Sequence, residues 1–395
     1  MKFSDVAFPV GHIWSSPFAR WQGKLSEISS LDTGVAVTTR ALAERGVDPA
    51  QLNGIVHGWT NPMPDIFYGA PTIAARIGAG HISGPMVVQA CATSVASIQA
   101  AAAQVQSDED LQLVVCSDRM SNGAVVIYPQ PSAACGAPLL TNWTLDGFAQ
   151  DPIGGTSMLV TADNVARSGG ISRAECDNLK AMRYQQYTTA LENDRAFQKT
   201  YMVPVEVQVG RKKVTLEADE GIRPVDLDTI RGMRTVMPDG FHTGASQTHP
   251  ADGSAGVVLT TVTRARELSD GEGVVQLLAS AIARVEKAHM PAAPVPAALS
   301  ALATAGLSIE QVDLVTTHNP FAVNDLYFSK MTGYPLEKMN LRGCSLIFGH
   351  PQAPTGMRCI AELVNELKAR GGGVGLFAGC AAGDSGMALV VKVGD

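Results

Sequence analysis

The chain contains 395 residues, of which 46% are hydrophobic and 17% are charged, with a formal net charge of −7 at pH 7. This size and composition predict a globular protein with a large buried core, and the length favours two or three domains. The negative net charge gives no overall attraction to nucleic acid or to an anionic membrane surface, so binding to either is not expected.

The N-terminal segment, MKFSDVAFPVGHIW, has no basic region followed by a long apolar core, which predicts cytoplasmic residence. No apolar run in the sequence approaches the roughly 20 residues needed to cross a bilayer. The seven cysteines are scattered without paired spacing, and neither CxxC nor HExxH occurs. We therefore expect reduced cysteines, no disulfide framework and no metal site.

The two halves of the chain resemble each other. Residues 41–58, ALAERGVDPAQLNGIVHG, and residues 301–318, ALATAGLSIEQVDLVTTH, align without gaps, and each predicts a helix end, a turn and a strand. After each copy a strand leads into a helix, and a second apolar strand follows at residues 111–118 and 372–380. Strands that alternate with helices indicate α/β architecture with buried sheets. The repetition predicts two similar halves related by a pseudo-twofold axis.

In the first half, residues 87–103, VVQACATSVASIQAAAA, place Cys91 between an apolar strand and a helix of small residues. Unpaired N–H groups and partial positive charge at a helix N-terminus favour a thiolate, so Cys91 is a candidate nucleophile near neutral pH. The alternative is that Cys91 is a small apolar filler of the core.

Between the halves, residues 121–244 are punctuated by prolines and by a pair of glycines. Within this segment we expect one helix, from Ser172 to about Glu192, opened by a capping box of Ser172 and Glu175. We interpret the rest as a loop-rich insert that covers the site.

In the second half, two short segments with polar residues interrupt apolar, glycine-rich sequence: FGHP, which contains His350, and GCAAGDSG, which contains Cys380. Under the pseudo-twofold symmetry, the His350 loop and the Cys91 turn occupy corresponding places, each ahead of its helix. We therefore expect the axis to bring Cys91 and His350 together. Each residue alone also fits a role as a core filler, as do the remaining cysteines, Cys116, Cys135, Cys176, Cys344 and Cys359.

The ordered blocks resemble those of the thiolase family of coenzyme A-dependent acyltransferases across the whole chain. They are VVQACATSVASIQAA, MLVTADNVARSGGISRAECD, ADEGIRPVDLDTI, THPADGSAGVVLTT, HNPF, GHP and GCAAGDSG. This resemblance implies a thiolase-like duplicated α/β/α/β/α layered fold with mixed central sheets and an inserted loop domain. The implied domains are residues 1–120 with 245–265, the loop domain 121–244, and residues 266–395.

The resemblance also implies roles for the site residues. Cys91, deprotonated by His350, would attack an acyl thioester and carry the acyl group, releasing coenzyme A. Cys380 would act as acid and base on the second substrate, because a thiol pKa near 8.5 lets it take and return a proton near pH 7. One oxyanion hole would use His350 with His318, and the other the backbone N–H groups of Cys91 and Ala382.

Two residues depart from the family pattern. His318 stands where most thiolases have the asparagine of an NEAF block, and it resembles the sterol-carrier-type branch instead. Ala382 replaces the usual glycine of a Cys-x-Gly motif. Its N–H still serves an oxyanion hole if the backbone there does not require positive φ.

No permanently bound cofactor is implied; coenzyme A and acyl-CoA are expected as substrates. The residues that the resemblance assigns to the coenzyme A tunnel are Met158, Arg223, Thr229, Thr248 and Phe321. Residues 211–213, Arg-Lys-Lys, are either a patch for the nucleotide phosphates or a solvated turn between two strands.

The sequence thus predicts a thiolase-like acyl-CoA acyltransferase that condenses acyl-CoA molecules or cleaves 3-oxoacyl-CoA by a ping-pong mechanism. The alternatives are a decarboxylating or polyketide-type condensing enzyme, against which Cys380 argues, and a catalytically silent thiolase-shaped subunit. The family resemblance implies a homodimer or homotetramer, and an accessory subunit is possible.

Overall fold

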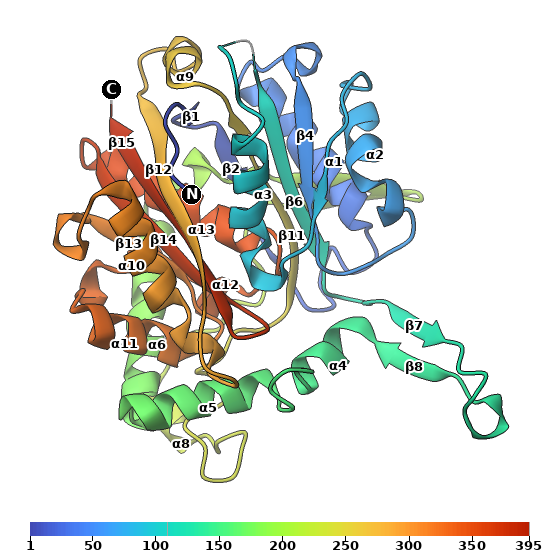
Figure 1. The fold of residues 1–395 in the computed structure, drawn as a ribbon, viewed down its shortest axis with the longest axis vertical. Helices are drawn as coiled ribbons and strands as arrows, with labels where there is room; N and C mark the ends of the chain where they lie inside the picture. The colour runs from blue at the N-terminus through green and yellow to red at the C-terminus, as the bar shows by residue number, and fades with distance from the viewer. Residues whose placement is uncertain (109, 395) are drawn as a thin grey trace.

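The computed structural model describes residues 1–108 and 110–394, and Figure 1 shows two β-sheets with helices between them and on their outer faces. The first sheet has six strands in the order β2-β11-β6-β4-β5, with β3 beside β11. β4 runs parallel to β5 and β6, whereas β11 is antiparallel to its neighbours, so the sheet is mixed. Its strands are β2 (Ile13–Ser15), β3 (Ala19–Arg20), β4 (Gly54–Gly58), β5 (Met86–Val87), β6 (Gln112–Arg119) and β11 (Ala251–Leu259).

The second sheet has five strands in the order β1-β12-β15-β14-β13. β13 and β14 are parallel and the other pairs are antiparallel, so this sheet is also mixed. Its strands are β1 (Ala7–Pro9), β12 (Val274–Arg284), β13 (Leu314–His318), β14 (Gly373–Ala381) and β15 (Ser385–Gly394). The first strand of the chain therefore pairs with the C-terminal sheet, while β2 joins the other.

Two buried helices, α3 (Thr93–Ala102) and α13 (Thr355–Ala369), pack against each other between the sheets (Figure 1). Nearly every residue of both helices is buried, as a helix covered on all sides requires. The small residues of α3 permit close contact: an added Cβ on Gly356 would lie 3.0 Å from the Ser94 side chain. The outer faces are covered by α1 (Ser30–Glu44) and α2 (Gly69–Arg76) on one side and by α10 (Pro294–Ala305) on the other.

The predicted duplication is confirmed. The order β2-β11-β6-β4 in the first sheet matches β12-β15-β14-β13 in the second. Before β4, α1 ends and a 3₁₀ turn follows at Pro49–Gln51; before β13, α10 ends and a 3₁₀ turn follows at Ile309–Gln311. α3 and α13 are thus equivalent helices: α3 leads into β6, which is parallel to β4, and α13 leads into β14, which is parallel to β13.

The insert contains more regular structure than the sequence predicted. The capping box of Ser172 and Glu175 opens the expected helix, α6 (Arg173–Ala190). A second helix, α5 (Met158–Gly169), precedes it, capped by the Ser157 side chain and ended by Gly170 in the left-handed conformation. The other elements of the insert are β7 (Val125–Tyr128), β8 (Leu139–Asn142), α4 (Trp143–Ala149), α7 (Glu192–Arg195), β9 (Val205–Val209), β10 (Lys212–Leu216) and α8 (Leu227–Gly232). In Figure 1, the hairpin of β7 and β8 extends away from the body of the molecule.

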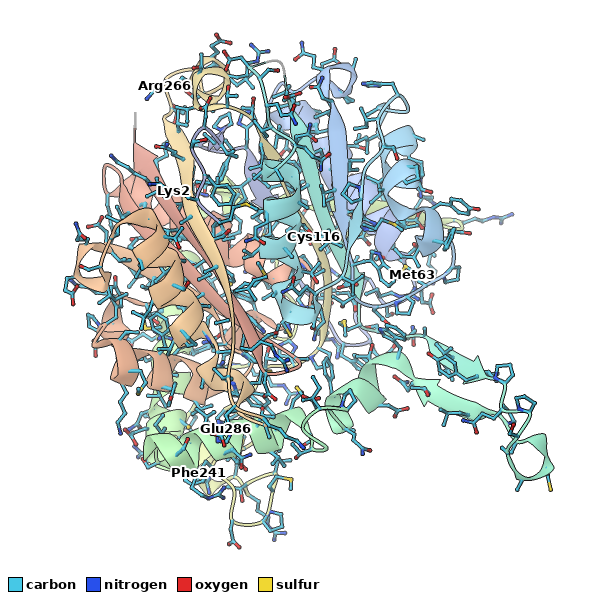
Figure 2. The ribbon with its side chains drawn as sticks, in the orientation of Figure 1. Lys2, Met63, Cys116, Phe241, Arg266 and Glu286 are labelled. Atoms are coloured by element: carbon cyan, nitrogen blue, oxygen red, sulfur yellow. The ribbon has the colours of Figure 1, made fainter. Side chains whose placement is uncertain are left out.

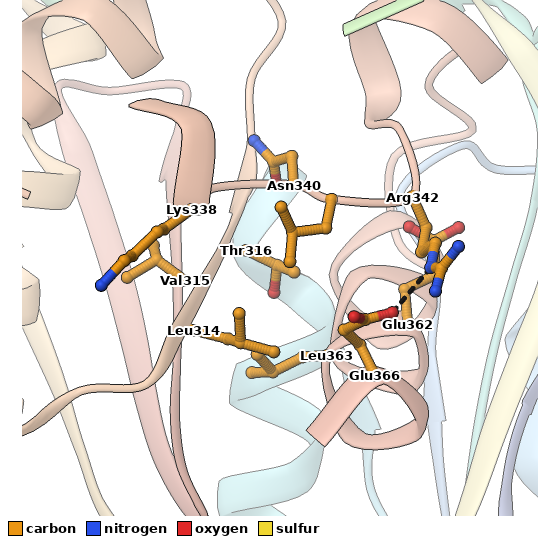
Figure 3. A pocket seen from close by; sticks show the side chains of 10 residues that line it. Leu314, Val315, Thr316, Lys338, Asn340, Arg342, Glu362, Leu363 and Glu366 are labelled. Carbon is orange, nitrogen blue, oxygen red and sulfur yellow. Dashed lines mark hydrogen bonds and ion pairs between the residues drawn. The ribbon is translucent and has the colours of Figure 1, made fainter. Parts of the chain in front are cut away.

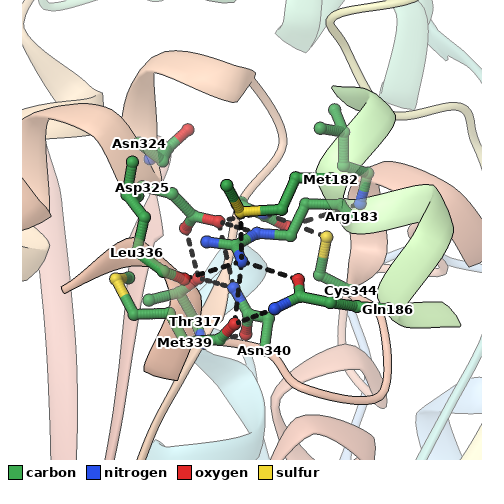
Figure 4. Close-up of polar contacts among 12 residues, drawn as sticks. Met182, Arg183, Gln186, Thr317, Asn324, Asp325, Leu336, Met339, Asn340 and Cys344 are labelled. Atoms are coloured by element: carbon green, nitrogen blue, oxygen red, sulfur yellow. Dashed lines mark hydrogen bonds and ion pairs between the residues drawn. The ribbon is translucent and has the colours of Figure 1, made fainter. Parts of the chain in front are cut away.

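A buried ion pair fixes the insert to the C-terminal half. Arg183 of α6 donates through Nε to the Asp325 carboxylate at 2.8 Å, and both side chains are fully buried. Asp325 lies on α11 (Ala322–Thr332) and also accepts from Thr317, Asn319 and Asn340 (Figure 4). Because the carboxylate is satisfied from several sides, this network holds the end of β13 in place.

A second buried ion pair supports the segment before His350. Both terminal nitrogens of Arg358, on α13, donate to the two oxygens of Asp219 at 2.6 and 2.7 Å. The guanidinium also lies 3.7 Å from the ring centroid of Phe348, the last residue of α12 (Ser345–Phe348). This stacked and bidentate arrangement fixes the direction in which the chain enters the Gly349 turn.

Five of the seven cysteines were expected to be core fillers, and four of them are buried, among them Cys116 on β6, labelled in Figure 2. The expectation is wrong for Cys135, which lies exposed between β7 and β8. Helix α9 (Val262–Leu268), which also lies outside the insert, connects β11 with β12. Within residues 1–108 and 110–394, no helix has the length and apolar character needed to cross a membrane.

Candidate active site

A cleft of about 290 Å³ opens where the two halves and the insert meet. It contains the predicted nucleophile Cys91, the predicted base His350 and Ala382, together with Met158, Thr248 and Phe321 from the predicted tunnel. The remaining lining residues are Phe148, Ser157, Leu159, Gln247, Pro250, Met290, Pro320 and Gln352. The lining is mostly apolar with few polar groups, as in sites for organic ligands.

Cys91 lies in a tight turn, a 3₁₀ segment at Ala90–Ala92, directly before α3. Ala90 adopts a left-handed φ of 45°, which an alanine reaches only under strain. The Thr93 hydroxyl stabilises the turn, because it donates to the Ala90 carbonyl at 2.7 Å and accepts from the Gln89 N–H at 2.9 Å. The Cys91 thiol itself donates to Gln352 Oε1 at 3.1 Å.

The resting state of Cys91 differs from the sequence-based expectation of an easily formed thiolate. Burial raises the pKa of the Cys91 thiol to about 12, although the N–H groups of Ala382 and Cys91 act in the opposite direction. The expectation considered only the helix terminus, whereas the packing of the insert and of the His350 loop over the sulfur removes its solvent. The free enzyme therefore holds a neutral thiol at pH 7.

His350 lies in the loop that leads from α12 to α13. Its Nδ1 is 2.7 Å from the Thr355 hydroxyl, and its Nε2 has no hydrogen-bond partner. Burial, together with the neighbouring His318, lowers the pKa of His350 well below its usual value, so the ring is neutral at pH 7. The loop is attached to the other half, because the Ala353 N–H donates to Asp118 at 3.0 Å. A neutral imidazole can accept the Cys91 proton.

His318 ends β13 and stacks on His350, with ring centroids 4.0 Å apart and an interplanar angle of 30°. Its Nδ1 is 3.2 Å from the Ser345 hydroxyl, which donates its single hydrogen to Asn319 Oδ1 at 3.0 Å. Asn319 is oriented in turn, because its Nδ2 donates to Asp325 at 2.8 Å. We infer that His318 donates through Nδ1–H, which leaves the lone pair on Nε2. Burial lowers the pKa of His318 to about 3, so this neutral form is the resting one.

Cys380 lies next to the end of β14, fully buried, and Gly379 beside it pairs with His318 of β13. Asn324 Nδ2 lies 3.3 Å from the Cys380 sulfur. Burial raises the pKa of Cys380 well above its usual value, and the charge of a Cys91 thiolate would raise it further, so the two thiols are within electrostatic range of each other.

The two backbone donors predicted for the second oxyanion hole, the N–H groups of Cys91 and Ala382, both act to lower the pKa of the Cys91 sulfur. Ala382 is absent from the positive-φ positions, whereas Gly383 and Asp384 have φ values of 85° and 54°. The left-handed geometry of the turn therefore falls after Ala382, and the alanine keeps its N–H without backbone strain. Asp384 secures the turn by accepting from the N–H groups of Ala288 and His289, both at 2.9 Å.

Two of the residues assigned to the coenzyme A tunnel lie outside the cleft. Arg223 is exposed, and exposed Thr229 lies in α8, where its N–H and hydroxyl donate to Asp226. The basic residues 211–213 are exposed on the hairpin β9–β10, which packs on α1: Arg211 lies in the turn, and Lys212 and Lys213 begin β10. Lys213 pairs with Glu206 at 2.7 Å. Arg223, Thr229 and residues 211–213 do not line the cleft. The hairpin matches the interpretation of residues 211–213 as a solvated segment between two strands.

Sequence reasoning did not identify four polar residues that contact the site. Gln352 accepts from Cys91, Asn324 donates to Cys380, and Thr355 and Ser345 contact the rings of His350 and His318. The signal for Gln352, Asn324 and Thr355 was present, because these polar residues follow the HNPF and GHP blocks within a few positions.

A second, much smaller void lies at the opposite end of β13 and holds about 10 Å³, the space of a single water. Figure 3 shows its lining side chains, with the ion pair of Arg342 and Glu366 at one side. It has no room for an organic substrate.

Known proteins agree with this geometry. The family models described as thiolase N-terminal domain and thiolase C-terminal domain match residues 12–263 and 272–393. The chain is similar to the mitochondrial 3-ketoacyl-CoA thiolase of Rattus norvegicus, with 27% identity covering 95% of this chain and 96% of the relative. It is also similar to the acetyl-CoA acetyltransferase of Pseudomonas aeruginosa, with 28% identity covering 94% of this chain and 95% of the relative.

Solved structures give the same result for the fold. A crystal structure of human mitochondrial 3-ketoacyl-CoA thiolase superposes with a TM-score of 0.88 at 25% identity, covering 98% of both chains. A structure of human mitochondrial 3-ketoacyl-CoA thiolase in complex with CoA gives 0.90 at 24% identity over 100% of both. The predicted layered fold is therefore confirmed, and the chain belongs to the thiolase family.

Proposed function

We propose that the protein is a thiolase-type acyl-CoA acyltransferase, which condenses two acyl-CoA molecules or cleaves a 3-oxoacyl-CoA with coenzyme A. The observation that carries this proposal is a cleft lined by the Cys91 thiol and the neutral His350 imidazole, with a second thiol, Cys380, buried within electrostatic range of Cys91. The backbone N–H groups of Cys91 and Ala382 lower the pKa of the Cys91 sulfur. Coenzyme A and acyl-CoA are substrates, and the chemistry needs no permanently bound cofactor.

In the first half-reaction, Cys91 attacks the thioester carbonyl of an acyl-CoA while His350 Nε2 takes the thiol proton. Transfer of the proton and attack occur together, because the resting thiol and imidazole are both neutral. The N–H groups of Cys91 and Ala382 stabilise the tetrahedral oxyanion. Coenzyme A leaves with a proton returned by His350, and the acyl group stays on Cys91.

In the second half-reaction, Cys380 acts on the other substrate. For condensation the Cys380 thiol first passes its proton to His350, and the resulting thiolate removes a proton from the methyl carbon of acetyl-CoA. The enolate then attacks the acyl group on Cys91, and the Cys91 thiolate that is released takes the proton back from His350. For cleavage the same thiol returns the proton to the leaving enolate. Asn324, which lies at the Cys380 sulfur, stabilises the thiolate form that appears during this step.

His318 supports a closer relation to the sterol-carrier-type branch of the family, as the HNPF block suggests. The Nε2 of His318 carries a lone pair, so the ring accepts a hydrogen bond at this atom. We propose that one water donates to His318 Nε2 and to the enolate oxygen. His350, once protonated, donates directly. Together they form the first oxyanion hole.

The pantetheine arm of coenzyme A is proposed to enter past Met158, Thr248 and Phe321, which line the cleft. Arg223 and Thr229 lie outside this cavity, so we assign them to the outer part of the coenzyme A path, where the phosphates need polar partners. Replacing Arg223 then weakens coenzyme A binding without preventing acylation of Cys91 at saturating acyl-CoA.

Single-turnover labelling with radioactive acetyl-CoA tests the function and the division of roles. Wild-type enzyme should become labelled on Cys91, and Cys91→Ser should not. Cys380→Ser should be labelled normally but should neither condense nor cleave substrate. Equal loss of labelling in the two variants would contradict the division of roles. The double variant is needed as well, because groups that act as a unit are not additive.

The same experiment separates the alternatives. A catalytically silent subunit would give no label on Cys91. A decarboxylating condensing enzyme would become labelled but would extend the acyl group only with a malonyl-type thioester, and Cys380 is an unexpected residue for such an enzyme.

We propose a homodimer or homotetramer, with an accessory subunit as a further possibility. Large apolar side chains are exposed on the projecting hairpin, including Val125, Ile127 and Leu140, which are 60–62% exposed. Apolar side chains gathered on a protruding element favour a protein contact. Light scattering coupled to size-exclusion chromatography gives the mass, and a monomer would contradict the proposal. Cytoplasmic residence is likewise a proposal, checked by cell fractionation.

A further inference from the structure

Three side chains that commonly bind metals meet from three separate segments; Cys91 and His350 line the cleft, and His318 is buried beside them. Cys91 comes from the turn before α3, His318 from the end of β13, and His350 from the loop before α13. The Cys91 sulfur and one ring nitrogen of each histidine all lie within 4.8 Å of one another. Within residues 1–108 and 110–394, this is the one such group of three histidine, cysteine or acidic side chains.

Both imidazoles have a free nitrogen in a buried position. His318 is 0% and His350 4% exposed, yet neither Nε2 has a hydrogen-bond partner. Buried polar atoms are nearly always paired, so two adjacent unpaired nitrogens indicate a missing partner. His318 donates through Nδ1–H to the Ser345 hydroxyl, so its Nε2 carries a free lone pair. The Nε2 of His350 likewise carries a free lone pair when its Nδ1–H donates to the Thr355 hydroxyl. Metal-binding histidines are oriented in this way through their second nitrogen.

We propose that Cys91, His318 and His350 bind a single zinc ion, or a divalent ion of similar softness, which blocks the resting active site reversibly. Thiolate and imidazole ligands suit zinc. On binding, the Cys91 S–H bond breaks, a sulfur–metal bond forms, and the proton passes to solvent; no group is oxidised or reduced. No sequence spacing announced this site, because its ligands are 32 or more positions apart in the chain.

Side chains must rotate before the site can hold such an ion. Zinc–sulfur and zinc–nitrogen bonds of about 2.3 and 2.0–2.1 Å separate tetrahedral ligand atoms by roughly 3.3–3.6 Å, so the Cys91 side chain must turn toward the two nitrogens. The rings of His318 and His350 are stacked with an interplanar angle of 30°, so one imidazole must also turn for both Nε2 lone pairs to point at one ion. A water from the cleft, or Gln352 Oε1 at 3.1 Å from the Cys91 sulfur, supplies the fourth ligand. The ion uses the sulfur that an acyl group would occupy, so metal binding and acylation of Cys91 exclude each other.

Direct measurement of metal binding tests the proposal and does not depend on acyl transfer. The background is Cys135→Ser, which removes the exposed Cys135 thiol as a competing ligand. ZnCl₂ binding is measured by equilibrium dialysis with elemental analysis, and CoCl₂ binding by the thiolate-to-cobalt charge-transfer absorption. One ion per chain and a thiolate band are expected.

Variants identify the ligands. His318→Asn keeps a polar side chain but removes the imidazole, and it should weaken zinc binding by roughly 100-fold or more, since loss of even an outer-shell partner costs about 10–100-fold. Cys91→Ser should abolish the charge-transfer band. Cys380→Ser and His249→Gln are matched controls, because they remove a thiol and a histidine outside the cluster; both should bind zinc as tightly as the background protein.

Three results would overturn the proposal: no stoichiometric binding of either ion, zinc affinity unchanged by His318→Asn, or binding lost in Cys380→Ser. Circular dichroism of each variant shows whether a loss of binding reflects unfolding. If labelling of Cys91 by acetyl-CoA fails while zinc binds as described, the function proposed above is wrong and the metal site stands.

Discussion

The protonation state of Cys91 in the resting enzyme leads to a prediction about its reactivity. With a pKa of about 12, roughly 10⁻⁵ of the thiol is ionised at pH 7, compared with about 3% for a free cysteine of pKa about 8.5. The population of thiolate is thus lower by about 3,000-fold. A thiolate of higher pKa is intrinsically more nucleophilic, by about 40-fold for this difference with a Brønsted slope of about 0.45. Alkylation of Cys91 should therefore be roughly 100-fold slower than that of a free thiol at pH 7.

Iodoacetamide provides the assay, with alkylation of the Cys91 peptide followed by mass spectrometry and N-acetylcysteine as the reference thiol. The rate at Cys91 should rise about tenfold per pH unit between pH 7 and 9, because each unit increases the thiolate fraction tenfold below the pKa. His350→Asn should leave this alkylation unchanged, since the resting His350 is neutral. The same variant should slow acylation by acyl-CoA, in which His350 takes the proton.

A plateau of the alkylation rate near pH 7, or a rate at Cys91 equal to that of the reference thiol, would refute this reasoning. Such a result would mean that a thiolate–imidazolium pair already exists in the free enzyme. Loss of alkylation in His350→Asn would also indicate a thiolate–imidazolium pair in the free enzyme.

Two further predictions concern the groups that support the site. Arg183→Met should lower the free energy of unfolding by about 3–5 kcal/mol, because it leaves the buried Asp325 carboxylate without its ion-pair partner. Urea unfolding measures this free energy. An equal loss of stability in the exposed control Arg40→Met would contradict the prediction. Thr355→Val should slow single-turnover acylation by about tenfold, since the hydrogen bond that orients His350 is worth about 1 kcal/mol or more. An unchanged rate in a folded Thr355→Val protein would show that His350 does not need this contact.

The sequence predicted the duplicated fold because the repeat at residues 41–58 and 301–318 contains the same helix, turn and strand in both halves. From the symmetry of the halves it also predicted that Cys91 and His350 would meet, whereas Cys380 was added only by the resemblance to the thiolase blocks. In both cases the signal is local, and the symmetry supplies the long-range arrangement.

What the sequence did not predict depends on contacts between distant segments. Arg183 looks like a surface residue of a polar helix, yet Asp325, 142 positions later, makes it a buried anchor. The raised pKa of Cys91 requires knowledge of what covers the sulfur, and the tautomer of His318 follows from a chain of hydrogen bonds through Ser345. None of these features leaves a periodic or spaced pattern in the sequence.

The contact between α3 and α13 has an evolutionary consequence. The two helices are equivalent members of the repeated halves and face each other between the sheets. A half-length polypeptide of this architecture would expose that helix and would have to cover it with a second copy, forming two equivalent crevices. In the present chain the two halves differ, and the proposed nucleophile, Cys91, lies in one half and the proposed base, His350, in the other.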